Sequence, residues 1–255
     1  MPNLATSGTY YWNSNRNTVI NRALRIVGNT NPSSADVTNA AEALNDLVKE
    51  WQTDGMPLWK ITIETPFAYT ATPTYLIGVG ATVNVPAPLK VLYAYNRTGS
   101  GSTQLDSPMA DIISVFDYER LGNKNATGRP SLMAYVPPGP NTNSANGDNV
   151  GTIYVYPTPD AYSISNVTCG IVTQRPYADF TATTDQPDFP SSWINALKWG
   201  LADQMSYEYG LPFAERGMIE KKADKHKKMA LEGATEETSL FIWPRPQYGN
   251  VDGSR

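Results

Sequence analysis

The spacing of apolar residues changes twice along this chain of 255 residues. From Val37 to Trp51 the apolar residues fall on one face of a 3.6-residue period, which predicts an amphipathic helix. Between Ile61 and Val172, short β-branched and aromatic runs are broken by Pro and Gly, as in half-buried strands. Helical spacing returns after Pro190. The pattern therefore predicts an α+β fold, in which a β segment is inserted into a bundle formed by N- and C-terminal helices.

Local end signals support the helical predictions. Gly28 can take the left-handed conformation that closes a helix, and Ser33 or Ser34 can cap the next helix. Helices are predicted at 17–28, from Ser33 or Ser34 to 54–55, at 108–121 with Ser107 as N-cap, from Ser191 or Ser192 to Gly210, and at 212–233. The helix at 108–121 interrupts the β segment, and the others flank it.

The middle of the chain carries the strand signals. Strands are predicted at 61–67, 75–77, 83–85, 91–95, 131–135, 152–156 and 166–172. Their short, regular lengths predict a small antiparallel sandwich or barrel-like domain, and 137–148 is predicted to be a long polar hairpin loop. We divide the chain into an N-terminal helical half of the bundle (1–59), the inserted β domain (60–187), a C-terminal helical half (188–233) and an extended tail (234–255).

Single copies of Cys and His exclude a disulfide, a Cys/His zinc cluster and any metal motif with two His. Cys169 lies within a predicted strand, where a small thiol usually belongs to the core. His226 lies among lysines on a predicted surface helix, which favours a solvated or interface side chain over a catalytic base. The run Gly78-Val-Gly80 lacks the third glycine of a dinucleotide loop and is predicted to be a turn. We expect no catalytic, cofactor or metal site.

The overall charge argues against a dedicated nucleic-acid binder. Twenty Lys and Arg stand against 24 Asp and Glu, which gives a net charge of −4. No apolar run approaches the roughly 20 residues that span a bilayer, and the N-terminus does not have the pattern of a secretory signal. We expect a protein made in the cytoplasm and without a membrane association.

Two surface segments are candidates for partner binding. The first is a lysine-rich stretch of the last predicted helix: Lys221, Lys222, Lys225, Lys227 and Lys228. It is either a solvated helical face or a surface for an acidic partner or DNA. The second is an apolar part of the tail: Leu240, Phe241, Ile242, Trp243, Pro244 and Tyr248. Because a tail broken by prolines has little capacity to form a core of its own, we expect it to insert into another chain.

Several runs, in this order, resemble one known family. They are Ile20–Gly28, Ala41–Trp59, Gly128-Arg-Pro-Ser131, Tyr154–Pro159, Asp188–Leu197 and Glu208-Tyr-Gly210. Together they span residues 18–232, and the chain resembles the head-to-tail adaptors of short-tailed phages (podoviruses), also described as tail accessory or packaged-DNA stabilisation proteins.

This resemblance implies a virion protein without an active site. Twelve copies would form a ring beneath the portal after DNA packaging, where they would extend and seal the DNA channel. The ring would present a platform for later tail components, such as a tail tube or nozzle protein, fibres or spikes. In this family the C-terminal tail docks onto the portal protein, which agrees with the prediction for the apolar tail.

Functions of other classes remain open on the residues alone. Asp203, Glu208 and Glu215 lie near one predicted helix junction, and paired carboxylates are what a peptidoglycan hydrolase would need. The tyrosine-rich strands are compatible with a glycan- or receptor-binding β module, or with a structural β protein of the capsid surface.

Overall fold

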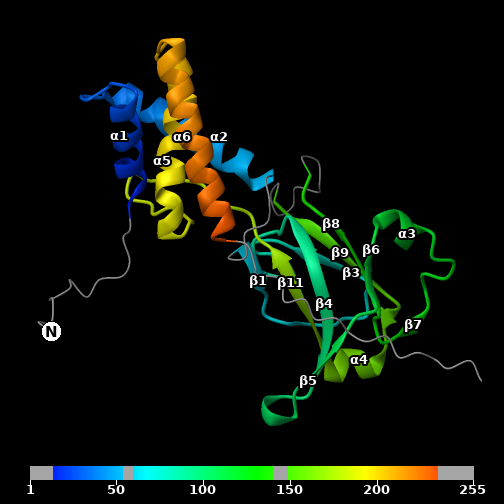
Figure 1. Ribbon diagram of the computed structural model, residues 1–255. Helices are drawn as coiled ribbons and strands as arrows, with labels where there is room; N and C mark the ends of the chain where they lie inside the picture. Colours follow the sequence, from blue (N-terminus) through cyan, green and yellow to red (C-terminus); the bar gives the residue numbers. More distant parts are fainter. Residues whose placement is uncertain (1–13, 54–59, 140–148, 235–255) are drawn as a thin grey trace, which may run out of the picture.

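The computed structural model describes residues 14–53, 60–139 and 149–234. These residues form a helical lobe and a β lobe, which lie side by side and meet at a narrow junction (Figure 1). The α+β class predicted from the sequence is confirmed. The predicted tail anchor and most of the predicted loop at 137–148 lie outside the described residues.

The helical lobe combines helices from both ends of the chain. It contains α1 (Arg16–Ile26), α2 (Ser34–Thr53), α5 (Ile194–Glu208) and α6 (Phe213–Glu232), which share one apolar core. The predicted end signals are present: the Asp36 N–H donates to the Ser33 hydroxyl at 3.2 Å, and Gly28 and Gly210 take positive φ values of 90° and 61°. Local sequence therefore sets the end of α1, the start of α2 and the end of α5.

Helix α5 is the centre of this lobe. It packs against α1, α2 and α6, so its buried residues surround the helix instead of forming the single stripe that the sequence suggested. The predicted cap at Ser191 or Ser192 is also wrong. The chain enters α5 through a 3-10 turn, η3 (Ser191–Trp193), in which the Trp193 N–H donates to the Pro190 carbonyl at 2.9 Å. That turn buries Trp193 beside Trp51, with ring centroids 5.8 Å apart.

The β lobe consists of short, mostly antiparallel strands. One sheet has the order β1 (Ile61–Ile63), β11 (Val167–Gln174), β4 (Lys90–Thr98) and β5 (Leu105–Pro108), and β2 (Phe67–Ala68) pairs with β11. A second sheet has the order β3 (Thr74–Ile77), β9 (Gly151–Tyr156), β8 (Leu132–Val136) and β6 (Asp111–Ile113), while β10 (Thr158–Pro159) pairs with β7 (Thr127–Gly128). Both main sheets contribute to one core, which contains the fully buried Cys169 as predicted. Burial raises the pKa of that thiol to about 12.

The predicted helix at 108–121 is wrong. Pro108 ends β5, and Ile112 and Ile113 form β6, which pairs in parallel with Met133 and Ala134 of β8. The helical part is limited to α3 (Val115–Glu119) and is capped by Ser114 instead of Ser107. The pairing of Ile112 and Ile113 with a distant strand thus outweighs their local helical spacing.

Other local differences are small. A short α4 (Ala161–Asn166), capped by the Asp160 side chain, precedes β11, and a 3-10 turn η2 (Gly101–Thr103) lies between β4 and β5. The predicted strand at 83–85 is reduced to one bridge between Val83 and Ile77. The predicted turn at Gly78-Val-Gly80 is present, and Gly80 has a φ of 79°.

The two lobes are joined through a buried ionic cluster. The Lys60 ammonium, which is 1% exposed, lies 2.7 Å from the Asp188 carboxylate and 3.9 Å from the centroid of the Tyr177 ring. Arg175 donates to both oxygens of Asp188, at 2.9 and 2.6 Å. Burial lowers the pKa of Lys60 to about 8, while its hydrogen bond to Asp188 opposes that shift. The cluster ties the start of β1 and the end of β11 to the segment that leads into α5.

Aromatic rings pack at the same junction between the lobes. Tyr177 stacks on Phe189 with ring centroids 4.6 Å apart and an angle of 5° between the planes. Both residues belong to the core of the helical lobe, although they lie in the connection between β11 and α5. The junction is therefore continuous with the helical core, which favours a defined position of one lobe relative to the other.

We predict that Gly200→Ala destabilises the helical lobe. A Cβ atom at Gly200 would lie 2.9 Å from Cζ2 of Trp51 and 3.1 Å from a methyl group of Leu47. Alanine favours helices by about 1 kcal/mol over glycine, but overpacking a core costs about 1–3 kcal/mol. Chemical denaturation should show a free energy of unfolding lower by about 1 kcal/mol, the difference between these two effects.

Gly217→Ala is the matched control, because a Cβ atom there meets no atom within 4 Å on helix α6. It should raise the free energy of unfolding by up to about 1 kcal/mol. Equal stabilisation by both substitutions would contradict the close packing of α2 against α5.

We also predict that the junction depends on the Asp188 carboxylate. Asp188→Asn leaves the Lys60 and Arg175 cations without their counter-ion, and breaking a buried pair in this way costs about 3–5 kcal/mol. Lys60→Met keeps the Arg175–Asp188 pair and an apolar stem of similar length, so it should cost less than about 2 kcal/mol. The free energy of unfolding of both variants checks this order, and a larger loss for Lys60→Met would refute it.

Candidate interaction surfaces

The lysines of the predicted basic stretch lie on more than one side of α6. The Lys222 ammonium lies 4.6 Å from the ring centroid of Trp199, on α5, and the Lys198 ammonium lies 5.7 Å from the same ring. Lys227 lies 5.2 Å from the Trp51 ring, on α2. Lys228 approaches Glu232 at 3.9 Å, one turn along the helix. The stretch is thus divided between different neighbours.

His226 belongs to the group around Trp199. Its imidazole stacks on the Trp199 indole, with ring centroids 6.2 Å apart and 14° between the planes. Partial burial and the nearby Lys198, Lys225 and Lys222 lower the pKa of His226, so the neutral imidazole is favoured at neutral pH. This placement agrees with an interface or packing role, because among the described residues no carboxylate or nucleophile contacts the ring.

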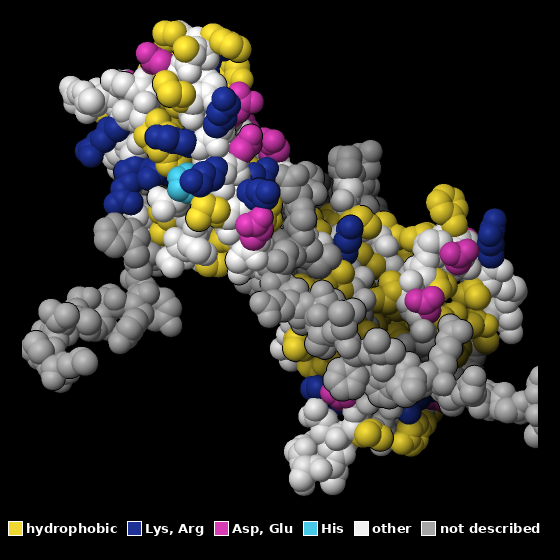
Figure 2. Space-filling model, in the orientation of Figure 1, with side chains coloured by type: hydrophobic (Ala, Val, Ile, Leu, Met, Phe, Trp, Pro, Cys, Tyr) yellow, Lys and Arg dark blue, Asp and Glu magenta, His cyan; other side chains and the backbone are white. Residues whose placement is uncertain are grey.

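A basic face can now be defined by its residues. It consists of Arg22, Lys198, Trp199, Lys222, Lys225 and His226, from α1, α5 and α6. Burial and the charge of Arg22 lower the pKa of Lys198, which places Arg22 in the same group. Figure 2 shows Lys and Arg side chains gathered around the histidine on the helical lobe. The sequence could not show this group, because Trp199, Lys198 and Arg22 are not part of the lysine-rich stretch.

A shallow cleft lies next to the basic face. It has a volume of about 240 Å³, and Trp199, Met218, Glu215 and Lys222 contribute to its walls. The carboxylate of Glu215 therefore lies on the side of α6 that carries Lys222. A cleft of this size, open to solvent, suits a side chain of a partner better than a small-molecule substrate.

The carboxylates considered for catalysis are not gathered at one point. Asp203 lies near Glu220, Asp224 and Glu50, and its burial together with these three charges raises its pKa. No contact between described residues joins Asp203 with Glu208 or Glu215. The acidic group Glu50, Asp203, Glu220 and Asp224 is called the acidic face below. Among the described residues, no group of three or more His, Cys, Asp and Glu could hold a metal ion.

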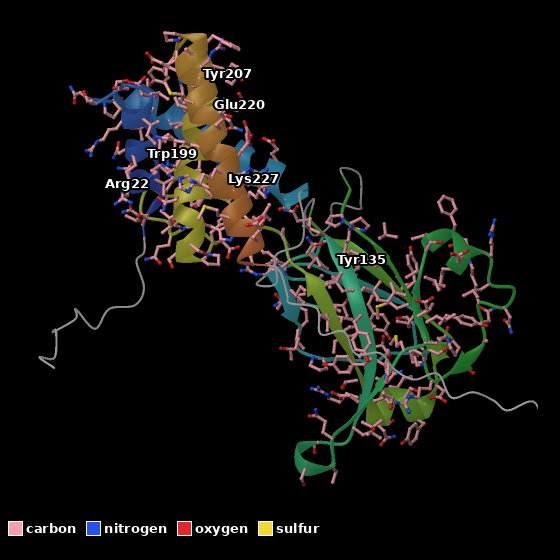
Figure 3. All side chains as sticks on the ribbon, viewed as in Figure 1. Arg22, Tyr135, Trp199, Tyr207, Glu220 and Lys227 are labelled. Carbon is pink, nitrogen blue, oxygen red and sulfur yellow. The ribbon has the colours of Figure 1, made fainter. Side chains whose placement is uncertain are left out.

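The acidic and basic faces lie on different sides of α6. In Figure 3, Arg22 and Trp199 lie to one side of this helix, and Glu220 and Lys227 lie to the other. Lys227 is thus a cation that accompanies the acidic face. Glu220, Asp224, Lys222 and Lys225 are all exposed.

Exposed apolar side chains mark the turn between α5 and α6. Tyr207 and Phe213 are 60% and 83% exposed, and Met218 is 62% exposed. The Arg216 guanidinium lies 4.9 Å from the ring centroid of Tyr207. In Figure 3, Tyr207 lies at the end of the lobe that is remote from the β lobe. A group of this kind is typical of a protein-binding surface.

A larger groove lies at the junction of the lobes. Its volume is about 620 Å³, and its walls include Lys49, Gln52, Tyr177 and the prolines Pro86, Pro88, Pro137, Pro138 and Pro176. It contains no cluster of titratable groups suited to catalysis among the described residues. Together with the exposed faces of α6, it shows a molecule with extended surfaces rather than an enclosed pocket.

Comparison with known proteins places the chain in a family. Residues 14–247 match the family model of the SU10 adaptor protein. No curated protein matches the chain. Separately, none of the described helices has the length and apolar character needed to cross a membrane. Because the family match covers all of the described helical and β lobes, and agrees with the resemblance to phage head-to-tail adaptors, the chain belongs to the SU10 adaptor protein family.

Proposed function

We propose that this protein is the head-to-tail connector of a short-tailed phage. In this proposal, copies of the chain form a ring of twelve beneath the portal, extend and seal the DNA channel, and provide the platform on which the tail is built. The observation that carries the proposal is the family match over residues 14–247, which includes both lobes. The proposed location is the portal vertex of the virion, after synthesis in the host cytoplasm.

The structure of the chain supports different roles for the two lobes. The helical lobe has a core of its own and exposes charged faces on α6, as a ring-forming body requires. The β lobe has a separate core and projects away from α6, so it can meet a tube or nozzle protein, fibres or spikes without disturbing the ring. DNA would pass through the lumen without sequence-specific binding, and the net charge of −4 disfavours strong attachment to its phosphates.

The apolar tail is assigned to the portal protein. Helix α6 ends at Glu232, and the segment with Leu240, Phe241, Ile242, Trp243, Pro244 and Tyr248 follows it in sequence. In Figure 1 the end of α6 lies at the junction of the lobes. Aromatic side chains on an extended segment are effective anchors because they bury a large area at a low cost in side-chain entropy.

We predict that the tail is necessary for portal binding. Deletion of residues 236–255, or the double substitution Phe241→Ala with Trp243→Ala, should weaken co-sedimentation with portal rings at least about tenfold, as loss of buried aromatic anchors does. The double substitution Asn250→Ala with Asp252→Ala is the matched control in the same tail and should bind normally.

Thermal unfolding separates binding from folding in this experiment. All the variants should keep the melting temperature of the unaltered protein, because the two described cores consist of residues that precede 236. Unchanged co-sedimentation of the Phe241→Ala, Trp243→Ala protein with portal rings would contradict the tail assignment. Native mass spectrometry of the unaltered complex counts the copies per portal ring, and a count far from twelve would contradict the proposed ring.

A further inference from the structure

Helix α6 carries opposite charges on opposite sides. Lys225 and His226 lie three and four residues after Lys222, so both flank Lys222 on one broad side of the helix. Glu220 and Asp224 are four residues apart and share another side. Two residues correspond to about 200° around a helix, so Lys222 faces almost directly away from both acids.

Neighbouring helices extend each side into a broader face. Arg22 of α1 and Lys198 of α5 join the basic face, while Glu50 of α2 and Asp203 of α5 join the acidic face. One acid, Glu215, lies beside Lys222, and two cations, Lys227 and Lys228, lie on the acidic side, where Lys228 is four residues from Asp224 and 3.9 Å from Glu232. Each face therefore has an excess of charge of one sign, to which the helices beside α6 contribute.

The charges within each face repel one another in a single copy. Burial and the surrounding cations lower the pKa of Lys198 and of His226, whereas burial and the surrounding acids raise the pKa of Asp203. The Oδ1 atom of Asp203 is also buried and accepts no hydrogen bond from any described residue. A surface of opposite charge placed against each face would relieve this repulsion.

We propose that the basic face of one copy packs against the acidic face of the next copy. The inference rests on the proposed function, in which copies form a closed ring. A ring needs a contact in which two different surfaces of the same chain meet, and opposite charges on opposite sides of one helix provide such a pair. A second copy is a better partner than DNA, since only another copy accounts for both faces together.

The size of the faces is adequate for this contact. Helix α6 has 20 residues, which corresponds to a length of about 30 Å. A contact that runs the full length of α6 and is two helices wide would cover about 600 Å² on each partner, so it would bury about 1,200 Å² in total, within the range of specific interfaces. Trp199 lies at the centre of the basic face, where aromatic residues contribute most to binding.

Charge reversal tests this pairing. One variant, Lys222→Glu with Lys225→Glu, makes the basic face acidic; a second, Glu220→Lys with Asp224→Lys, makes the acidic face basic. All four side chains are exposed, so both variants should fold, which circular dichroism checks. The assay titrates each protein onto portal rings and measures the midpoint and cooperativity of binding. Each variant alone should bind without cooperativity, with a midpoint raised at least roughly tenfold, because like charges now face each other.

The decisive experiment mixes the two variants. In a ring where they alternate, every contact again joins opposite charges, so an equimolar mixture should regain cooperative binding. A chain with all four substitutions should assemble with itself but not with the unaltered protein. Cooperative binding by each single-face variant alone, or no rescue in the mixture, would overturn the inference while leaving the proposed function intact.

Two further outcomes are distinguishable. If the unaltered protein does not bind portal rings at all, the proposed function fails, and the pairing fails with it. If the Lys222→Glu, Lys225→Glu protein assembles normally but loses affinity for a labelled DNA duplex in an anisotropy titration, the basic face binds DNA and the pairing is refuted. Added salt should raise the midpoint of the unaltered protein, because exposed ionic contacts are screened.

Discussion

The fold depends on the antiparallel pairing of β1 with β11. Ile61 lies opposite Gln174, and just beyond this pair the Arg175 N–H donates to the Lys60 carbonyl at 3.1 Å. The chain therefore enters and leaves the β lobe at the same point, although more than a hundred residues separate the two strands. Because of this pairing, helices from opposite ends of the sequence lie close together and can form a common core.

The junction shows how that pairing is extended into the helical lobe. Asp188 binds both Lys60 and Arg175, and the Tyr177–Phe189 stack continues into the packing around Trp193 and α5. The charged cluster fixes the direction of the connecting segments, because its hydrogen bonds are geometrically specific. The stacked rings exclude water from the cluster. The lobes thus behave as bodies with separate cores that are linked by one specific set of contacts.

Features determined within a few residues were predictable from the sequence. Gly28, Gly210 and Ser33 act at helix ends through local backbone geometry, and the buried Cys169 follows from its strand. Features that depend on a distant partner in the sequence were not predictable. Ile112 has a helical spacing but pairs with Met133, and the basic face joins side chains of α1, α5 and α6 around Trp199. The family was predicted from ordered sequence runs, whereas the acidic and basic faces required the relative positions of the helices.

The close approach of the two ends of the β segment has an evolutionary consequence. A segment whose ends are neighbours can be lengthened, shortened or exchanged while the body that holds it keeps its shape. The helical lobe and the β lobe of this chain can therefore diversify at different rates. In the proposed connector, one ring-forming body can in this way be fitted to many different tails.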